Sequence, residues 1–237
     1  MKSKETYMRG LRQWLEDTSD VPLEEMSDFF TERLEGYEQH MAVWEESYRK
    51  FAGLLPAGCG EILDLGCGTG LELDQIWQNN AHVKVTGVDL CQSMLRVLQK
   101  KHPDKLLTVV CQDYFRYDFG LGHWDAVISF ESLHHFLPER KKELYRKIYN
   151  SLKDDGLFIL GDYTACCDEE EELLRSVYME KRRRFGIPEE RFVHFDIPLT
   201  LVHELELLQS AGFRIAQMLD EPDGVTIITA QKDREQS

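Results

Sequence analysis

The sequence contains no run of about 18 apolar residues, and this absence argues against a helix that crosses a membrane. Its first residues, MKSKETYMRGLRQW, lack the apolar core of a secretory signal, so we expect a cytoplasmic protein. The six cysteines form no C-x-x-C pair and no cluster with histidines at zinc-ligand spacing. We therefore expect reduced, mostly structural thiols and no metal site.

Positive charge is also scarce, because 28 Lys and Arg residues face 43 Asp and Glu residues, which gives a formal net charge of −15. Such a surface repels phosphate backbones, so sequence-independent binding to DNA is not expected. A local basic patch could still bind RNA, but the charge favours a small molecule as the partner. The 42% of hydrophobic residues excludes a disordered chain, and 237 residues suffice for one domain with additions.

The first fifty residues predict helices. Apolar residues recur at helical spacing between Tyr7 and Leu15, and again between Met26 and Phe51. Gly36 interrupts the second stripe and predicts a bend or a close approach. We interpret residues 1–54 as a helical extension that packs on the core of the remaining chain.

From Glu61 onward, short apolar runs alternate with amphipathic segments, which predicts strands joined by helices. This order implies right-handed crossovers and a doubly wound, parallel sheet within residues 55–237. A short connection joins the last two predicted strands, so these must be antiparallel. The predicted strands are 61–65, 83–88, 106–110, 124–130, 157–160, 213–218 and 225–230.

A helix is predicted over residues 168–185, inside an insertion that spans about 162–200. Its first residues are acidic and its last are basic, which is the order that the helix dipole favours. A solvent-facing helix explains this pattern, and an RNA-binding cluster at Arg182–Arg184 is the alternative.

Three glycines at alternate positions, Gly66, Gly68 and Gly70, follow the first predicted strand and precede a helix. Glycine suits a backbone that must approach a ligand closely, and a helix start suits a carboxylate or phosphate. The spacing satisfies neither the dinucleotide pattern G-x-G-x-x-G nor a phosphate-binding P-loop. Asp64, in the strand before the loop, favours a ligand with positive charge.

Two further carboxylates follow strands in the same way. Asp89 ends the second strand about 20 residues after the loop, where a carboxylate can accept the two hydroxyls of a ribose. Asp113 follows the third strand, where it can accept from an adenine amino group. Because ligands of open α/β sheets bind beyond the carboxyl ends of the strands, we expect Asp64, Asp89 and Asp113 to converge on one crevice.

The chain resembles the class I S-adenosylmethionine-dependent methyltransferases over about residues 55–230. EILDLGCGTG at 61–70 is similar to the first motif of that family and VTGVDL at 85–90 to its second. CQD at 111–113 resembles the third motif and WDAVISF at 124–130 the fourth. SLKDDGLF at 151–158 resembles the segment that leads into the fifth strand of the family.

The resemblance implies a seven-stranded, mostly parallel sheet with an antiparallel last strand, and S-adenosylmethionine as the cofactor, released as S-adenosylhomocysteine. It implies that the glycine loop wraps the methionine part, that Asp89 holds the ribose and that Asp113 and Tyr114 flank the adenine. The N-terminal extension would fold over the cofactor, although packing on the core explains its pattern equally well. The implied cofactor contacts are Asp64, Gly66, Cys67, Gly68, Thr69, Gly70, Asp89, Leu90, Met94, Gln112, Asp113, Tyr114, Phe130 and Glu131, with Tyr37 and Trp44 from the extension.

Methyl transfer from a sulfonium is an in-line displacement in which positioning supplies much of the acceleration. A general base is needed only when the acceptor loses a proton in that step. His134, His135 and Tyr163 are the candidate catalytic residues, and a structural function of the two histidines is the alternative.

The expected function is methyl transfer to a small-molecule acceptor by a monomer or a homodimer, with the insertion 162–200 contacting the substrate or a second subunit. One alternative is an enzyme similar to those that convert S-adenosylmethionine to a carboxylated derivative for tRNA modification, with Arg182–Arg184 or Arg191 as the cation that this product needs. A non-catalytic cofactor-binding module is another alternative. A nicotinamide-dependent oxidoreductase is a distant one, because the glycine spacing is wrong.

Overall fold

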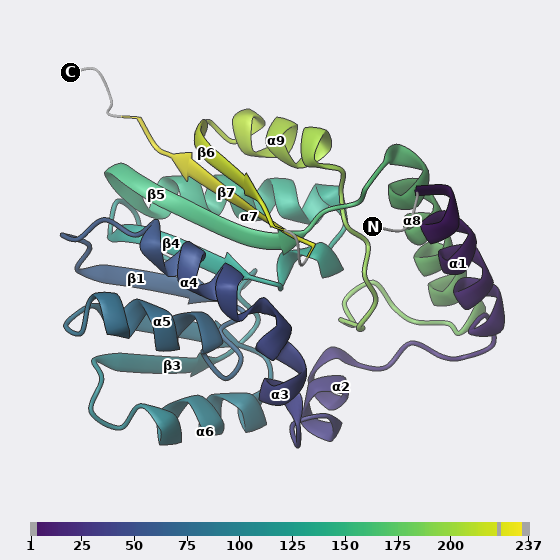
Figure 1. The fold of residues 1–237 in the computed structure, drawn as a ribbon, viewed down its shortest axis with the longest axis horizontal. Coiled ribbons are helices and arrows are strands. Elements are labelled where there is room, and N and C mark those ends of the chain that lie inside the picture. Colours follow the sequence, from purple (N-terminus) through teal and green to yellow (C-terminus); the bar gives the residue numbers. More distant parts are fainter. Residues whose placement is uncertain (1–3, 222–223, 234–237) are drawn as a thin grey trace.

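The computed structural model describes residues 4–221 and 224–233. Its centre is a seven-stranded sheet with the order β3-β2-β1-β4-β5-β7-β6 (Figure 1). The first five strands are parallel, and β7 pairs antiparallel with both β5 and β6. The doubly wound sheet and its antiparallel last strand are therefore confirmed. The strands are β1 (Glu61–Leu65), β2 (Lys84–Asp89), β3 (Leu107–Cys111), β4 (Trp124–Phe130), β5 (Leu152–Tyr163), β6 (Arg214–Asp220) and β7 (Val225–Gln231).

Helices cover both faces of this sheet because alternate strand residues are apolar on both sides. Ile62 faces a core shared with α4 (Glu45–Gly53), α5 (Leu71–Asn79) and α6 (Gln92–Lys101). Leu63 and Leu65 face the opposite core, shared with α7 (Pro138–Ser151) and α9 (Leu201–Ser210). Pro138 is the first residue of α7, as its preference for that position predicts.

One polar contact inside the second core joins α7 to α9. The Lys141 ammonium donates to Glu204 Oε2 over 2.6 Å, and the Tyr145 hydroxyl donates to the other oxygen of the same carboxylate. All three side chains are buried. A buried charge is tolerated only where a partner compensates it, so this contact fixes how the two helices meet.

The strand β5 is longer than the sequence indicates. Residues 153–156, which precede the predicted strand 157–160, lie within β5, and Asp155 takes a left-handed conformation with a φ of 62°. The pairing of β4 with β5 shifts register at this point, between Trp124 and Ala126. Residues 153–156 therefore mark an irregularity inside the strand rather than its start.

The second apolar stripe is not one continuous helix. It divides into α2 (Met26–Glu32), α3 (Tyr37–Met41), the 3₁₀ helix η1 (Ala42–Trp44) and α4. Gly36 precedes α3 with a φ of 82°, so the expected bend lies where glycine permits a left-handed residue. The stripe serves two purposes, because α4 packs on the sheet whereas α2 and α3 lie across the carboxyl ends of the strands (Figure 1).

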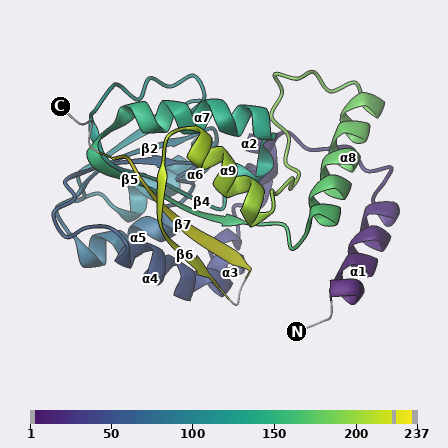
Figure 2. The same cartoon turned by 90° about the horizontal axis from the view of Figure 1, so that it is seen from above.

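The helix α1 (Lys4–Asp17) lies away from the sheet beside α8 (Asp168–Arg184), as both ribbon views show (Figure 2). Leu15 packs with Leu174 and Tyr178 in a small separate core, together with Val193 and Phe195. The start of the chain therefore pairs with the insertion. Among the described residues, the structure contains no helix with the length and apolar character needed to cross a membrane.

Candidate functional site

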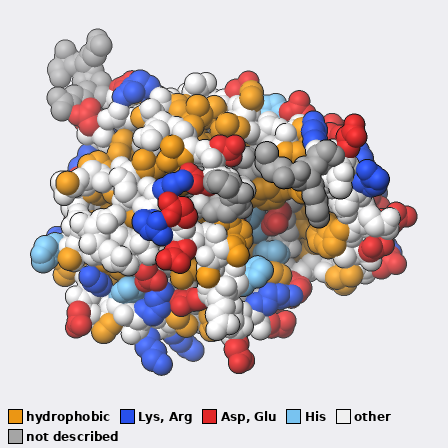
Figure 3. Space-filling view, viewed as in Figure 1, with side chains coloured by type: hydrophobic (Ala, Val, Ile, Leu, Met, Phe, Trp, Pro, Cys, Tyr) orange, Lys and Arg blue, Asp and Glu red, His pale blue; other side chains and the backbone are white. Residues whose placement is uncertain are grey.

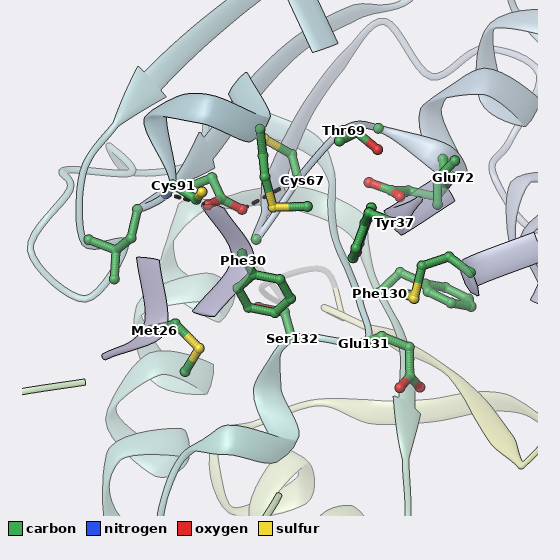
Figure 4. A pocket seen from close by; sticks show the side chains of 18 of the residues that line it. Met26, Phe30, Tyr37, Cys67, Thr69, Glu72, Cys91, Phe130, Glu131 and Ser132 are labelled. Atoms are coloured by element: carbon green, nitrogen blue, oxygen red, sulfur yellow. Dashed lines mark hydrogen bonds between the residues drawn. The ribbon is translucent and has the colours of Figure 1, made fainter. Parts of the chain in front are cut away.

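A pocket lies at the carboxyl ends of β1, β2 and β4. Its walls are the loop between β1 and α5 and the residues that end β2 and β4 (Figure 4). The segment from α2 to α4 covers it and contributes Met26, Phe30, Tyr37, Met41 and Tyr48.

The loop between β1 and α5 needs its glycines. The φ angles of Gly66, Gly68 and Gly70 are 77°, 47° and 74°, all in the left-handed region. A Cβ atom on Gly66 would lie 2.1 Å from the Ser132 hydroxyl oxygen, and a Cβ on Gly68 would lie 3.4 Å from the methyl of Met94. The loop therefore borders the pocket as bare backbone.

Asp89 connects this loop to the end of β2. Its Oδ2 accepts the backbone N–H of Gly68 over 2.9 Å, and its Oδ1 accepts the N–H of Cys91 over 2.7 Å. Burial raises the pKa of Asp89, although these backbone donors oppose that shift. Asp89 lies in the pocket wall, and a carboxylate that accepts two hydrogen bonds retains lone pairs for the hydroxyls of a ligand.

Two carboxyl groups share a buried site behind the loop. Asp64 is fully buried, and burial together with the neighbouring Glu72 raises its pKa well above the usual value. Glu72 lines the pocket, and burial raises its pKa to about 7. In Figure 4, Tyr37 points into the pocket beside Glu72.

The pocket is an acidic environment. Glu72, Asp89 and Glu131 line it, and none of its lining residues in the described part of the chain is Lys or Arg. Aromatic rings add to this preference, because Tyr37, Tyr48 and Phe130 also line the pocket and the face of an aromatic ring attracts cations. The site therefore favours a ligand with positive charge.

The structure brings together most of the residues expected at the cofactor. Asp64, Gln112, Asp113 and Trp44 are not in the pocket wall. The expected convergence of three aspartates is corrected, since only Asp89 faces the pocket: Asp64 lies beneath it, and Asp113 Oδ1 accepts the N–H of Phe115 over 2.8 Å. The expected residues that do line it are Gly66, Cys67, Gly68, Thr69, Gly70, Asp89, Leu90, Met94, Tyr114, Phe130, Glu131 and Tyr37.

Several lining residues were not expected from the sequence. Met26 and Phe30 belong to the apolar stripe, whose helical spacing is equally consistent with packing on a core, whereas Met41 lies in the part of the extension that was expected over the cofactor. Cys91 directly follows Leu90, and Ser132 directly follows Glu131; both preceding residues were expected at the cofactor. The position next to an expected contact is therefore the sequence signal that could have identified Cys91 and Ser132.

A cluster of histidines and carboxylates borders the pocket. His134 and His135 lie in the 3₁₀ helix η2 (Leu133–His135), and His134 Nδ1 is 2.6 Å from Asp162 Oδ1 at the end of β5. Burial alone would lower the pKa of His134, but the neighbouring carboxylates of Asp162, Asp196 and Glu131 outweigh it and raise the pKa to about 9. Glu131 has a left-handed backbone, with a φ of 49°.

The three candidate catalytic residues are not equivalent. His135 lines the pocket, His134 is buried behind it, and Tyr163 lies outside. The Tyr163 hydroxyl is 3.0 Å from that of Tyr7 and donates to Glu170, so it joins α1 to α8. Among the three, His135 alone is placed to contact a molecule in the pocket.

A second cavity meets the first at His135 and Phe136. Its walls include the aromatic side chains of Tyr178 and Phe192 and the guanidinium groups of Arg140 and Arg182. Arg140 stacks on Phe192, with its central carbon 4.8 Å from the ring centroid. The two cavities thus differ in charge: the charged side chains that line the first are acidic, whereas Arg140 and Arg182 line the second together with Glu139 and Glu189.

Comparison with known proteins agrees with this geometry. Residues 62–156 match a family model described as a methyltransferase domain. An S-adenosylmethionine-dependent methyltransferase from Mesorhizobium loti has a similar solved structure, with a TM-score of 0.58 at 20% identity over 77% of this chain and 95% of that one. At this identity the similarity supports the fold alone.

Two curated relatives carry the name carboxy-S-adenosyl-L-methionine synthase. The protein from Nautilia profundicola is 24% identical over 164 residues, which are 65% of this chain and 69% of that protein. The protein from Helicobacter pylori strain G27 is 25% identical over 183 residues, which are 72% and 75% of the two chains.

The first prediction concerns Asp89. We expect Asp89→Asn to weaken binding of S-adenosylmethionine by at least about tenfold, because it removes the charge from hydrogen bonds to the loop and to a ribose. Isothermal titration calorimetry measures this change. Asp104→Asn, at an exposed position outside the pocket, is the control and should bind normally. Equal affinities of the two variants would contradict the assignment.

The second prediction concerns pH. Glu72 gains its negative charge as the pH rises through about 7. The affinity for the positively charged S-adenosylmethionine should therefore rise roughly threefold to tenfold between pH 6 and pH 8. A hydrogen bond with Asp64 and the positive charge of Lys101 favour the ionised form of Glu72, whereas the negative charge of Asp74 opposes it. Binding titrations across this pH range should show that the affinity of the Glu72→Gln variant changes less with pH than that of the wild-type protein. The same pH dependence in both proteins would show that another group controls binding.

Proposed function

We propose that this chain, whose residues 62–156 match the model of a methyltransferase domain, is an S-adenosylmethionine-dependent methyltransferase that transfers the methyl group of S-adenosylmethionine to a small-molecule acceptor held in the second cavity. The acidic character of the first pocket carries this proposal. Bound there, S-adenosylmethionine supplies an activated methyl group on a positively charged sulfur.

In this proposal the residues of the first pocket bind and orient the cofactor. The glycine loop and Asp89 hold the adenosyl and methionine parts, and Tyr37, Tyr48 and Phe130 surround the charged sulfur. The cover formed by α2 and α3 excludes water from the site. Rate acceleration then comes mainly from holding the acceptor in line with the methyl group.

The second cavity suggests the class of acceptor. Its aromatic walls suit a flat, apolar molecule, and Arg140, which stacks on Phe192, suits a carboxylate or another anionic group on it. His135 and Phe136 border both cavities, so an acceptor bound there reaches the cofactor pocket beside His135. We therefore propose an aromatic acid as the acceptor.

Formation of a carboxylated cofactor is the second candidate, because two curated relatives carry that name. A carboxylate next to the sulfonium would need a cation in the cofactor pocket, and its lining residues in the described ranges include no Lys or Arg. The expected cations lie elsewhere. Arg182 donates to the Tyr178 hydroxyl over 2.6 Å and to the Arg191 carbonyl over 3.2 Å, and Arg184 pairs with Asp20.

The same contacts bear on the RNA alternative. Arg182 faces the second cavity and Arg184 is paired, so two of the three arginines that end α8 have partners within the protein. The second cavity is therefore better suited to a small molecule that fits between aromatic rings than to the phosphate backbone of RNA.

The third prediction tests the reaction. Purified protein incubated with methyl-labelled S-adenosylmethionine and a library of aromatic acids should release S-adenosylhomocysteine in equal amount to a labelled, methylated acid. Mass spectrometry identifies both products. A carboxylated cofactor in place of S-adenosylhomocysteine would overturn the proposal in favour of the second candidate, and cofactor binding without turnover would favour a non-catalytic module.

The fourth prediction tests the second cavity with the acceptor found in that experiment. Arg140→Met should raise the KM for the acceptor by roughly tenfold or more, since it removes one charged hydrogen-bonding group. The Kd for S-adenosylmethionine should not change. Arg146→Met, at an exposed position of the same helix, is the matched control. An increase in the cofactor Kd instead would place the effect in the first pocket.

A further inference from the structure

The side chains of His134, His135 and Asp196 lie close together where the two cavities meet. Asp196 belongs to the loop before α9, about 60 residues after the histidines, so no local spacing in the sequence predicts this cluster. Figure 3 shows histidine and acidic side chains in the hollow between the sheet and the pair of α1 and α8. Asp196 and His194 line a cavity on that side.

The distances within the cluster are those of metal ligands. Asp196 Oδ1 is 3.5 Å from His134 Nε2 and 3.3 Å from His135 Nδ1. Two ligands bound tetrahedrally at about 2.1 Å from one ion are separated by about 3.4 Å. The ligand atoms of all three residues lie within 4.8 Å of one another.

The surroundings supply the outer contacts that such a site needs. His134 uses its other nitrogen, Nδ1, to bond Asp162 Oδ1 over 2.6 Å, and Asp162 itself is buried. Metal-binding histidines characteristically bond a carboxylate in this way, which fixes the ring and directs Nε2 at the metal. At 2.6 Å, this contact is too short for both atoms to be ligands of one ion, so Asp162 orients rather than binds.

The charges also favour a cation. Asp162 Oδ2 is buried and has no hydrogen-bond partner among the described residues, and Asp196 Oδ1 faces the ring nitrogens of His134 and His135. Buried carboxylate oxygens without partners are costly, and a metal ion compensates that cost.

From these contacts we propose that His134 Nε2, His135 Nδ1 and Asp196 Oδ1 bind one divalent transition-metal ion, with Zn²⁺ as the best match. Two nitrogens and one oxygen leave a fourth position of a tetrahedral ion open, as in catalytic rather than structural zinc sites. On binding, the metal displaces the proton of His134 Nε2, and His135 Nδ1 gives up its contact with the Phe195 carbonyl, which lies 3.3 Å away.

This assignment gives the two histidines a function that does not require either to accept a proton. His135 borders both cavities, so the open position would receive an oxygen of the acceptor. This last point rests on the proposed function, whereas binding of the metal does not.

The fifth prediction is therefore measured without any acceptor. Protein treated with a chelator and dialysed against Zn²⁺ should retain one ion per chain by elemental analysis. Co²⁺ in its place should give the intense visible absorption of a tetrahedral site. Zn²⁺ should also raise the midpoint of thermal unfolding, because it binds the folded state.

Variants separate this site from adventitious binding. Asp196→Asn should lower Zn²⁺ affinity by at least tenfold, and Asp162→Asn should lower it by about 10- to 100-fold through loss of the outer contact. His203→Gln is the matched control, because His203 also pairs with a carboxylate, Glu171 Oε2 at 2.8 Å, but lies away from the cluster.

His135→Gln repeats the test should Asp196→Asn not fold. Failure to bind one equivalent of Zn²⁺, or equal binding by the Asp196 and His203 variants, would overturn the proposal. A ligand variant that loses Zn²⁺ binding but retains methyl transfer would confirm the metal site and show that the reaction does not need the metal.

Discussion

The structure depends on a group of neighbouring carboxyl side chains at the carboxyl edge of a parallel sheet, where burial raises their pKa values. Asp64, Glu72 and Asp89 are kept close together by β1, β2 and the glycine loop between them, and no Lys or Arg from the described chain lines the pocket. Burying like charges costs free energy, so this arrangement is stable only with shared protons or a bound cation. A sulfonium cofactor meets that requirement, and the left-handed glycines let it approach the backbone.

The cover over the pocket follows from the same requirement. The helices α2 and α3 place Phe30 and Tyr37 over the acidic groups, and Gly36 lets the chain turn between them. Water exclusion strengthens each electrostatic contact beneath this cover. The helix α4 then returns to the sheet, where Phe51 is fully buried, so one stripe of sequence provides both a cover and part of the core.

Much of the fold was predictable from the sequence because it depends on local patterns. The alternation of strands and helices gave the sheet, and the glycine spacing before α5 located the pocket. Contacts between distant segments were not predictable. Asp196 meets His134 only after the insertion folds back, and Asp113 turns to its own backbone at Phe115. Helical spacing at Met26 and Phe30 could not distinguish a pocket wall from a core, since both bury the same face.

A crystal structure with S-adenosylhomocysteine bound tests the central claim most directly. The account predicts the amino acid part along Gly66–Gly70, the ribose hydroxyls on the Asp89 carboxylate and the sulfur beneath Tyr37 and near Glu131. A ligand bound elsewhere, or one in this pocket that leaves Asp89 without contact, would contradict it.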